Sequence, residues 1–429
     1  MTAALLTDKY ELTMLAAALR DGTADRQASF EVFARRLPFG RRYGVVAGTA
    51  RFLAALASFR FDDAALASLD FLDPATLQWL ADYQFRGDID GYPEGELYFP
   101  ESPVLSVHGT FAECVILETL ALSIFNHDTA IASAAARMVS AAGGRPLIEM
   151  GSRRTHEQAA VASARAAYLA GFAASSNLEA QRTYGVPALG TSAHAFTLLH
   201  TSDSGPDEVS AFRSQVDALG VDTTLLVDTY DITQGVANAI AVAGPELGAV
   251  RIDSGDLGVM ARQVRAQLDS LGATRTSIVV SGDLDEYSIA GLAAAPVDVY
   301  GVGTSVVTGS GAPTASMVYK LVEVDGLPVA KRSSQKESHG GRKAALRVHK
   351  PSGTIVEEVV HPVGAVPTDL DGLPTCTITV PLVRSGSVVS DTSLDGARAR
   401  VAAGLQGLPW DGLKLSRGEP AVATRLVSA

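Results

Sequence analysis

The sequence has little cysteine. It also lacks the excess of basic residues that proteins use to bind anionic polymers. Cys114 and Cys376 are the only 2 cysteines among 429 residues, too few and too far apart for a disulfide framework or a thiolate metal site. We therefore expect a reducing compartment, the cytoplasm. Acidic residues outnumber basic ones by 47 to 35, and the net charge of -12 would repel nucleic acid and anionic membranes. An anionic ligand would need a local basic pocket.

Long hydrophobic runs are also lacking. No run of about 18 consecutive apolar residues occurs, which is the minimum for a spanning helix. The amino terminus, MTAALLTDKYELTML, has charged residues where a signal peptide needs an apolar core. We expect a soluble protein without a targeting segment. With 47% hydrophobic residues, the chain is long enough for a large core and for two domains.

The central part of the sequence has the rhythm of β/α units. A helix is predicted from Ser123 to Ala142, capped by Asn126 or Asp128 and ended by two glycines. Short apolar runs then recur, separated by roughly 20 to 35 residues, the length of a helix and two loops. These runs are PLIEMGSRR, VPALGTSAH, TTLLVDTYD, GAVRIDSGD, SIVVSGDLD and VDVYGVGTS. The pattern predicts a parallel sheet.

Both ends of the chain have the pattern of antiparallel strands. YKLVEVDGLPVAKRS, GTIVEEVVHPVG and TCTITVPLVRSG alternate in strand fashion, with turns at DG, PSG and RSG. The segments Tyr83–Gly91 and PEGELYFPESPVLSVHGTF near the amino terminus look similar. We predict an α/β fold with a central irregular TIM-like α/β barrel, residues 116–344. An α+β sheet domain built from both chain ends, residues 1–115 with 345–429, would flank it.

Glycine and polar residues cluster at the carboxyl ends of the last five apolar runs. Ligands bind at that edge of barrels and open parallel sheets, because it carries the variable βα loops. One such cluster is more often an ordinary turn, whereas five in succession predict a shared pocket.

Two of these clusters suit phosphate and sugar groups. VYGVGTS places Gly301 and Gly303 directly after a strand, followed by Thr304. Backbone N–H groups and a hydroxyl there would hold a phosphate dianion, although a plain glycine turn explains the motif equally well. VSGDLDE supplies Gly282 and Asp283, and a carboxylate beside a glycine suits a sugar diol.

Arginines occur in two of the apolar runs, GAVRIDSGD and PLIEMGSRR. Arg251 and Asp253 in RIDSGDL are two residues apart on a strand, so their side chains point the same way. They would form a buried salt bridge, or Arg251 would bind a phosphate or pyrophosphate oxygen and Asp253 a ribose hydroxyl or a magnesium-bound water. Arg153 and Arg154 in EMGSRR would ordinarily be one solvated and one salt-bridged residue. A pocket for several phosphates and a carboxylate would use both.

His194, one of 8 histidines, follows the apolar run ALGTSAH. A lone histidine beside an apolar strand is usually structural. One β/α unit later, LLVDTYD ends near Asp228, on a strand expected to be a neighbour. A carboxylate that accepts from one ring nitrogen leaves the other free as a nucleophile, so His194 is a candidate to attack a phosphoryl group.

Together these motifs resemble those of the nicotinate phosphoribosyltransferases, of the type II phosphoribosyltransferase class. Similar segments run nearly from end to end: LLTDKYELTM, PEGELYFPESPVLSVHGTFAECVILET, EMGSRR, GFAASSN, GTSAHAF, VDTYD, RIDSGDL, YGVGTSVVT, YKLVEVDG and a later GRK. The resemblance implies that nicotinate, phosphoribosyl pyrophosphate, ATP and water yield nicotinate mononucleotide, pyrophosphate, ADP and phosphate, in NAD salvage.

The resemblance also implies roles for single residues. His194 would be transiently phosphorylated by ATP, with Asp228 orienting it and Asp253 as the third catalytic residue. Tyr10 would stack on the pyridine ring from the partner subunit of a homodimer with a shared active site. The other substrate-binding positions would be Arg153, Arg154, Ser176, Thr191, Arg251, Gly282, Asp283, Gly301, Gly303 and Thr304. Mg²⁺ is the implied cofactor, with its ligands left open, and ATP the co-substrate; no nucleic acid or membrane partner is expected.

Two positions bear on which pyridine base, nicotinate or nicotinamide, the enzyme would use. Ser176 stands where nicotinamide-using relatives have an Asp that accepts from the amide, so nicotinate is favoured. Met150 stands where the family often has an aromatic, so one wall of the ring stack becomes a thioether contact. Three alternatives stay open: a nicotinamide- or quinolinate-specific relative, a barrel phosphosugar isomerase or aldolase, and a non-catalytic binding protein. A Schiff-base aldolase would need a lysine in the five clusters, which have none.

Overall fold

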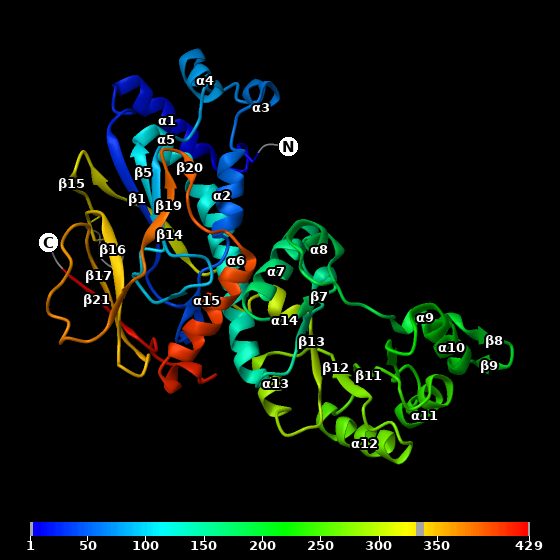
Figure 1. Cartoon of the computed structure of the whole chain (residues 1–429). Coiled ribbons are helices and arrows are strands. Elements are labelled where there is room, and N and C mark those ends of the chain that lie inside the picture. Colours follow the sequence, from blue (N-terminus) through cyan, green and yellow to red (C-terminus); the bar gives the residue numbers. More distant parts are fainter. Residues whose placement is uncertain (1–2, 332–338, 428–429) are drawn as a thin grey trace. The chain divides into compact units, whose positions relative to one another are not determined.

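The computed structural model describes residues 3–331 and 339–427, which fold into two compact units (Figure 1). Unit 1 contains Met1–Ser133 and Ala312–Ala429, and unit 2 contains Ala134–Gly311. The borders predicted from the sequence lie after residues 115 and 344 instead. One source of the difference is β14 (Met317–Val324), which pairs with β1 (Gln27–Ala34) in unit 1 rather than with the central strands.

Unit 1 is built on a seven-stranded sheet to which both chain ends contribute (Figure 1). Its strands lie in the order β15 (Leu327–Pro328), β14, β1, β5 (Leu105–Thr110), β3 (Asp88–Gly91), β19 (Val380–Arg384) and β20 (Ser387–Val388). Each neighbouring pair is antiparallel. All residues of β1 after Gln27 are buried, so this strand lies in the core. The prediction that the two chain ends share one sheet is therefore confirmed.

Two hairpins of this sheet have the turn residues that their backbone requires. Asp325 and Gly326 both have positive φ, 49° and 78°, and join β14 to β15 in a two-residue turn. Ser385 and Gly386, at 48° and 75°, join β19 to β20 in the same way. Such turns match the twist of antiparallel strands and favour Asp-Gly and similar pairs, which is why DG and RSG marked them in the sequence.

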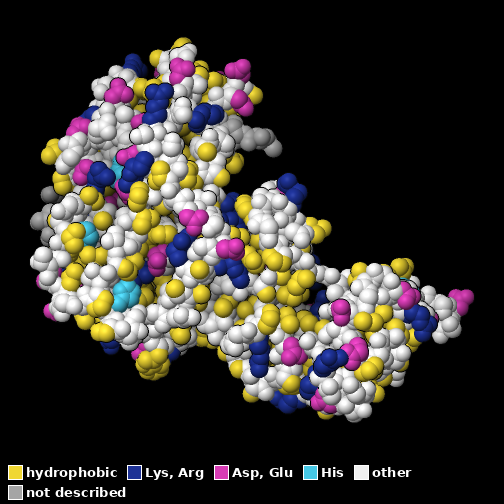
Figure 2. Space-filling view, in the orientation of Figure 1, with side chains coloured by type: hydrophobic (Ala, Val, Ile, Leu, Met, Phe, Trp, Pro, Cys, Tyr) yellow, Lys and Arg dark blue, Asp and Glu magenta, His cyan; other side chains and the backbone are white. Residues whose placement is uncertain are grey.

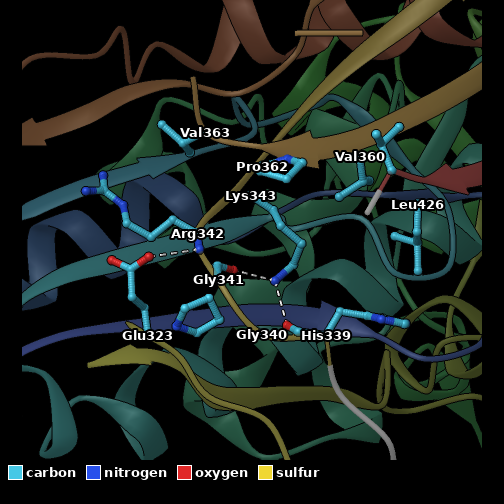
Figure 3. Close-up of a pocket in the computed structure, with 12 residues that line it drawn as sticks. Glu323, His339, Gly340, Gly341, Arg342, Lys343, Val360, Pro362, Val363 and Leu426 are labelled. Carbon is cyan, nitrogen blue, oxygen red and sulfur yellow. Dashed lines mark hydrogen bonds between the residues drawn. The ribbon is translucent and has the colours of Figure 1, made fainter. Parts of the chain in front are cut away.

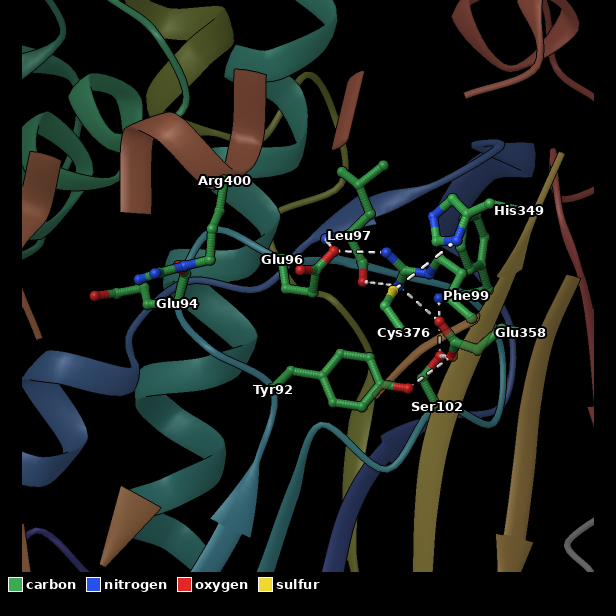
Figure 4. Close-up of polar contacts among 11 residues, drawn as sticks. Tyr92, Glu94, Glu96, Leu97, Phe99, Ser102, His349, Glu358, Cys376 and Arg400 are labelled. Atoms are coloured by element: carbon green, nitrogen blue, oxygen red, sulfur yellow. Dashed lines mark hydrogen bonds and ion pairs between the residues drawn. The ribbon is translucent and has the colours of Figure 1, made fainter. Parts of the chain in front are cut away.

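A buried charge network lies beside the second sheet of unit 1 (Figure 4). This sheet has the order β18 (Thr375–Thr377), β16 (Lys343–His349), β17 (Ile355–Pro362) and β21 (Ala423–Leu426). Arg347 on β16 donates to Glu358 Oε2 at 2.7 Å and to Glu96 Oε1 at 2.6 Å. Tyr92 and Ser102 donate hydroxyl hydrogen bonds to the same Glu358. Each charge in the network has a partner within the chain.

The long helix α6 (Glu118–Ala142) begins in unit 1 and ends in unit 2. It starts earlier than predicted, because Asp128 is not a cap: its buried carboxylate pairs with Arg51 Nη1 at 2.7 Å. The helix ends at two glycines with positive φ, as predicted. The stretch from residue 111 to 142 is long and apolar enough to cross a membrane by length and composition, and 67% of its most apolar window is buried inside the protein.

The remaining elements of unit 1 are short. They are α1 (Lys9–Asp21), α2 (Thr49–Ala57), α3 (Asp63–Ala67), α4 (Pro74–Ala81), α5 (Phe111–Val115), α15 (Leu394–Gly407), the 3₁₀ turns η1 (Pro38–Gly40) and η3 (Trp410–Leu413), and the paired strands β2 (Gly44–Val45) and β4 (Leu97–Tyr98). Figure 2 shows basic and acidic side chains interspersed on the face drawn.

Unit 2 contains a curled, six-stranded parallel sheet (Figure 1). Its order is β10 (Thr224–Leu226), β11 (Ala249–Ile252), β12 (Ser277–Val280), β13 (Val299–Val302), β6 (Leu147–Glu149) and β7 (Ala174–Ser175). This is the chain order of a barrel opened between β7 and β10. Among the described residues the sheet is a half-barrel, because the predicted strand VPALG makes only one bridge, from Ala188 to Ser175. Pro187 has no N–H to extend that pairing.

Helices connect the parallel strands of unit 2. They are α7 (Glu157–Leu169), α8 (Leu178–Tyr184), α9 (His194–Leu199), α10 (Glu208–Leu219), α11 (Ile232–Ala243), α12 (Leu257–Ser270), α13 (Glu286–Gly291), α14 (Thr304–Val307) and the 3₁₀ turn η2 (Ser152–Arg154), with a small hairpin of β8 (Thr201–Ser202) and β9 (Gly205–Pro206). The predicted alternation of strands and helices is therefore present.

Candidate active site

The carboxyl ends of three neighbouring strands, β10, β11 and β12, bring two of the predicted catalytic residues together. Asp228 Oδ2 accepts hydrogen bonds from the backbone N–H of Asp253 and from the hydroxyl of Ser254, both at 2.8 Å. Asp253 Oδ1 in turn accepts from the hydroxyl of Ser281 at 2.5 Å. These contacts run across the edge of the sheet and fix both carboxylates at the rim where the βα loops begin.

His194, the first residue of α9, faces this rim. Its Nε2 lies 3.8 Å from Asp228 Oδ1, and its Nδ1 is hydrogen-bonded to Thr229 Oγ1 at 3.1 Å. The side chain of His194 is 40% exposed and that of Asp228 only 1%. Asp228 Oδ1 is buried and has no hydrogen-bond partner in the described part of the chain, so its charge is available to the imidazole. We did not predict Thr229, although its hydroxyl follows Asp228 directly in VDTYD.

Arg251 on β11 is not paired with Asp253. No ion pair joins them in residues 3–331 and 339–427, and Asp253 is bonded to Ser281 instead. Arg251 Nη1 lies 3.5 Å from the carbonyl oxygen of Ser192, and its Nε is buried without a partner. The salt-bridge alternative is therefore not what the structure contains. A guanidinium without a carboxylate partner can bind an anionic ligand.

Arg153 and Arg154 lie on η2, directly after β6, and both are exposed. In the part of the chain that the structure describes, neither guanidinium has an ion pair or hydrogen bond, so the ordinary arrangement with one salt-bridged arginine does not occur. Ser176, after β7, and Thr191, before α9, are also exposed. All four side chains are open to a ligand at the same edge of the sheet.

The glycine clusters allow close backbone approaches. Gly282 has φ +107°, and a Cβ there would lie 2.5 Å from the carbonyl oxygen of Asp253. Asp283 follows with φ 46° and is exposed. A Cβ at Gly301 would lie 2.8 Å from Met150 Sδ, so the thioether packs on the Gly301 backbone. A larger residue at Gly282 would displace Asp253, and hence the hydrogen bonds of the rim.

Gly303 and Thr304 lie at the start of the four-residue helix α14. A Cβ at Gly303 would make only an ordinary contact, 3.5 Å from the carbonyl oxygen of Met150, and Thr304 is exposed. This turn is therefore open toward the same edge as the arginines of η2.

Three predicted clusters contain two aspartates each, and only the first of each lies at the rim. The second is a helix cap: Asp231 accepts from the backbone N–H of Gln234 at 2.8 Å, and Asp256 accepts from that of Val259 at 3.1 Å. Asp285 caps α13 in the same way. The structure thus separates the structural aspartates from Asp228, Asp253 and Asp283, a distinction that the motifs alone did not make.

Glu149, the last residue of β6, is a buried carboxylate at this edge that we did not predict. It accepts hydrogen bonds from the backbone N–H of Gly151 at 2.5 Å and from the hydroxyl of Ser175 at 2.6 Å. Burial raises the pKa of Glu149 although these hydrogen bonds favour the ionised form. The signal in the sequence is a charged residue that ends an apolar strand in EMGSRR.

Tyr10 belongs to unit 1, where it lies in the first turn of α1. Tyr10 is 44% exposed. Burial of the hydroxyl end and the nearby carboxylates of Glu118 and Glu11 raise the pKa of Tyr10. The phenol therefore stays neutral at physiological pH.

The GRK segment lines a hollow of about 700 Å³ in unit 1 (Figure 3). Lys343 Nζ donates to the carbonyl oxygens of His339 and Gly341, both at 2.8 Å, and pairs with the buried Glu31 at 2.8 Å. Arg342 lies beside it in the same hollow. The lysine is therefore held in place by the chain itself.

Comparison with known proteins gives the same family along the whole chain. Residues 5–126 match the nicotinate phosphoribosyltransferase N-terminal domain, and residues 146–351 match the nicotinate phosphoribosyltransferase family. Nicotinate phosphoribosyltransferase pncB1 of Mycobacterium tuberculosis is 72% identical, over 100% of this chain and 96% of its own. Nicotinate phosphoribosyltransferase of Bacillus subtilis is 38% identical, over 80% and 73%.

A solved structure is also similar over nearly all of the chain. The crystal structure of human nicotinic acid phosphoribosyltransferase has a TM-score of 0.82 and 27% identity, with 98% of this chain and 97% of that chain covered. The resemblance stated from the motifs is thereby confirmed. This chain belongs to the nicotinate phosphoribosyltransferase family.

Proposed function

We propose that this enzyme transfers the phosphoribosyl group of phosphoribosyl pyrophosphate to nicotinate and couples the transfer to ATP hydrolysis through a phosphohistidine at His194. The observation that carries the proposal is the hydrogen-bonded rim of Asp228, Asp253 and Ser281 with the half-exposed imidazole of His194 facing it. The curled sheet of unit 2 serves as the TIM-like barrel of the predicted fold, with its ligands at the carboxyl edge.

His194 acts as the nucleophile toward ATP. Asp228 Oδ1 is buried, unpartnered and on the Nε2 side of the ring, so it favours the tautomer with the proton on Nε2. Nδ1 then has the lone pair that attacks the γ-phosphorus, the phosphorus–oxygen bond to ADP breaks, and ADP leaves with the electron pair. Thr229 donates to Nδ1 in the resting state and gives up that place to the phosphoryl group. Water later releases phosphate from the histidine.

Guanidiniums without a carboxylate partner bind the phosphoribosyl substrate. Breaking the anomeric bond develops positive charge on the ribose and negative charge on pyrophosphate. Arg153, Arg154 and Arg251 have no carboxylate partners in the described residues and would stabilise the leaving group, while Asp253 and Asp283 are close to the sugar hydroxyls. Phosphorylation of His194 adds nearly two negative charges at this edge, which would reorder the loops and alter substrate affinity.

Mg²⁺ fits this set of groups as a companion of the substrate phosphates. Residues 3–331 and 339–427 contain no cluster of three or more His, Cys, Asp or Glu that would hold a metal by itself. Mg²⁺ usually binds through one or two carboxylates, waters and substrate phosphates. Asp253, with one carboxylate oxygen bonded to Ser281, has the other for such a role. When bound, the ion would neutralise charge on the pyrophosphate.

The base-binding residues favour nicotinate. Ser176 is exposed, directly after β7, and has no charge to repel a carboxylate. Tyr10 would stack on the pyridine ring from a second copy of the chain, which makes the working unit a homodimer with a shared active site. We further propose that the enzyme works in the cytoplasm.

Product analysis tests the proposal. The purified enzyme is incubated with nicotinate, phosphoribosyl pyrophosphate and Mg-ATP, and acid-labile phosphate on the protein is measured alongside nicotinate mononucleotide. We expect both, with ADP formed in step with product. Mononucleotide without phosphoprotein or ATP cleavage would overturn the coupling, and faster turnover of nicotinamide or quinolinate would overturn the choice of base.

A further inference from the structure

Glu149 lies between two turns that the proposed function uses for different ligands. Its carboxylate accepts from the backbone of Gly151, at the start of the turn that carries Arg153 and Arg154, and from the hydroxyl of Ser175, the last residue of β7, which leads into the turn at Ser176. Its carbonyl oxygen accepts from the backbone N–H of Ser176 at 2.8 Å. One buried residue thus holds both turns.

Further hydrogen bonds close this contact into a ring. The Ser175 hydroxyl accepts from the backbone N–H of Asn177 at 3.0 Å, and Asn177 Nδ2 donates to the Ser152 hydroxyl at 3.0 Å. Ser152 begins the arginine turn and adjoins Gly151, so the path returns to Glu149. Asn177 also caps α8 by accepting from Ala180 at 2.9 Å, which fixes its own position.

The arginine turn is also tightly packed on the glycine turn after β13. A Cβ at Gly151 would lie 2.2 Å from Val307 Cγ1 and 2.9 Å from the carbonyl oxygen of Gly303. The hydrogen bond to Glu149 keeps Gly151 in this position. A shift of Gly151 would therefore move the arginines relative to the predicted phosphate turn.

We propose that Glu149 is a positioning residue that sets the spacing between the pyrophosphate-binding arginines and the base-binding turn at Ser176. The inference rests on the proposed function and adds a residue that touches neither substrate. Transfer requires the anomeric carbon and the pyridine nitrogen at a reactive distance, and a misplacement of about 1 Å is costly. A shared anchor for the two turns provides that spacing.

Glu149→Gln tests the role with little change in side-chain volume. The carboxylate accepts from two donors, whereas the amide has one oxygen, so its NH₂ would face either Gly151 N–H or the Ser175 hydroxyl. We expect the KM for phosphoribosyl pyrophosphate and for nicotinate each to rise about tenfold, and kcat to fall at least as much, because the bound substrates are no longer held at the reactive distance. Ligand binding measured by calorimetry should weaken in parallel for both.

Arg145→Gln is the matched control. Arg145 precedes β6 at the opposite end of the strands and donates to Tyr300 Oη at 2.8 Å and to the carbonyl oxygen of Ala293 at 2.9 Å. Its loss should lower the melting temperature without moving either KM. If Glu149→Gln lowers only the melting temperature, as Arg145→Gln does, Glu149 is merely structural and the inference falls.

Ser152→Ala provides a milder variant should Glu149→Gln fail to fold. It removes the Asn177 contact between the turns but leaves the buried carboxylate intact, and we expect smaller rises in the same two KM values. Unchanged values would overturn the inference. A wild-type enzyme that makes no nicotinate mononucleotide would instead overturn the proposed function, so the two failures are distinguishable.

Discussion

One arginine of unit 1 and two arginines of unit 2 have opposite surroundings. In unit 1, Arg347 is 3% exposed and donates to Glu96 and Glu358, so the charge is neutralised within the fold. In unit 2, Arg153 and Arg154 are exposed at the carboxyl edge of the sheet, and among the described residues they have no acidic partner. An arginine that stabilises the fold has its partner in the chain. An arginine that binds an anionic ligand has no such partner until the ligand binds. Substitution of the first kind should therefore lower stability, and substitution of the second kind should lower ligand affinity.

The largest effect is expected for His194→Ala. The variant lacks the nucleophile, so ATP hydrolysis should fall by about 10³-fold or more, and the acceleration by ATP should disappear. Slow, ATP-independent formation of nicotinate mononucleotide should remain, because the arginines and carboxylates of the rim are intact. Rates with and without ATP are compared by product analysis. Full ATP stimulation in the variant would contradict the role of His194.

Arg347→Met should be the most destabilising change. It leaves Glu358, which is 0% exposed, and Glu96 without their cation, and removal of one partner of a buried ion pair costs about 3–5 kcal/mol. Chemical unfolding measures the loss. Arg425→Met is the control, since Arg425 pairs with Glu357 at 3.1 Å near the surface and such pairs contribute about 0–1 kcal/mol. Equal losses in the two variants would contradict the assignment.

Arg153→Ala should show the reverse pattern. Because Arg153 has no ion-pair partner among the described residues, the free energy of unfolding of the variant should change by no more than about 0.5 kcal/mol. Its affinity for phosphoribosyl pyrophosphate should fall by about 1.5–3 kcal/mol, as for a charged hydrogen bond. Calorimetric titration and thermal unfolding give both values. Arg182→Ala is the control, because Arg182 is exposed on α8 and paired with Glu179. A change in binding there would show a nonspecific charge effect.

Much of the fold could be predicted from the spacing of apolar residues and from the turn residues between the apolar runs. The DG and RSG turns marked hairpins because positive φ limits the choice of residue, and the apolar runs marked the parallel strands. The sequence predicted a TIM-like barrel, but not that the barrel is open, since closure depends on pairing between distant strands and Pro187 interrupts one of them. The start of α6 was missed for a related reason: Asp128 looked like a cap but is neutralised by Arg51, a partner far away in sequence.

The candidate site was predictable where chemistry and strand position coincide. Asp228 and Asp253 follow neighbouring parallel strands, so their proximity follows from topology. Asp231 and Asp256 carry the same functional group, and only the cap geometry shows that they serve the helices. Glu149 was missed because one acid at the end of an apolar strand has no motif; its two donors become visible only in three dimensions.

Tyr10→Ala tests whether unit 1 contributes to the site from a second copy. Loss of a ring that stacks on nicotinate should weaken binding by about 0.5–1.5 kcal/mol. Met14→Ala, one turn further along α1 and 38% exposed, is the matched control. Mixed dimers of Tyr10→Ala and Arg153→Ala chains should contain one intact site and regain activity. No recovery on mixing, or an unchanged affinity in Tyr10→Ala, would contradict a shared site.

The smallest effect is expected in the acid dependence of stability. Burial would raise the pKa of Asp128, but the hydrogen bond from His127 and the Arg51 guanidinium hold it below its usual value. A carboxyl with a lowered folded-state pKa stabilises the protein above its unfolded pKa, and the contribution is lost as the pH falls through the folded value. The wild-type protein should therefore lose stability below about pH 5.

Asp128→Asn should lack this acid-dependent loss, although its stability at neutral pH is lower. Glu149→Gln should change the slope in the opposite sense, because burial raises the pKa of Glu149 and its contribution is lost as the pH rises. Chemical unfolding of the three proteins between about pH 3 and pH 7 measures these slopes. Parallel curves for wild type and Asp128→Asn would show that the neighbouring cations do not set the pKa of Asp128.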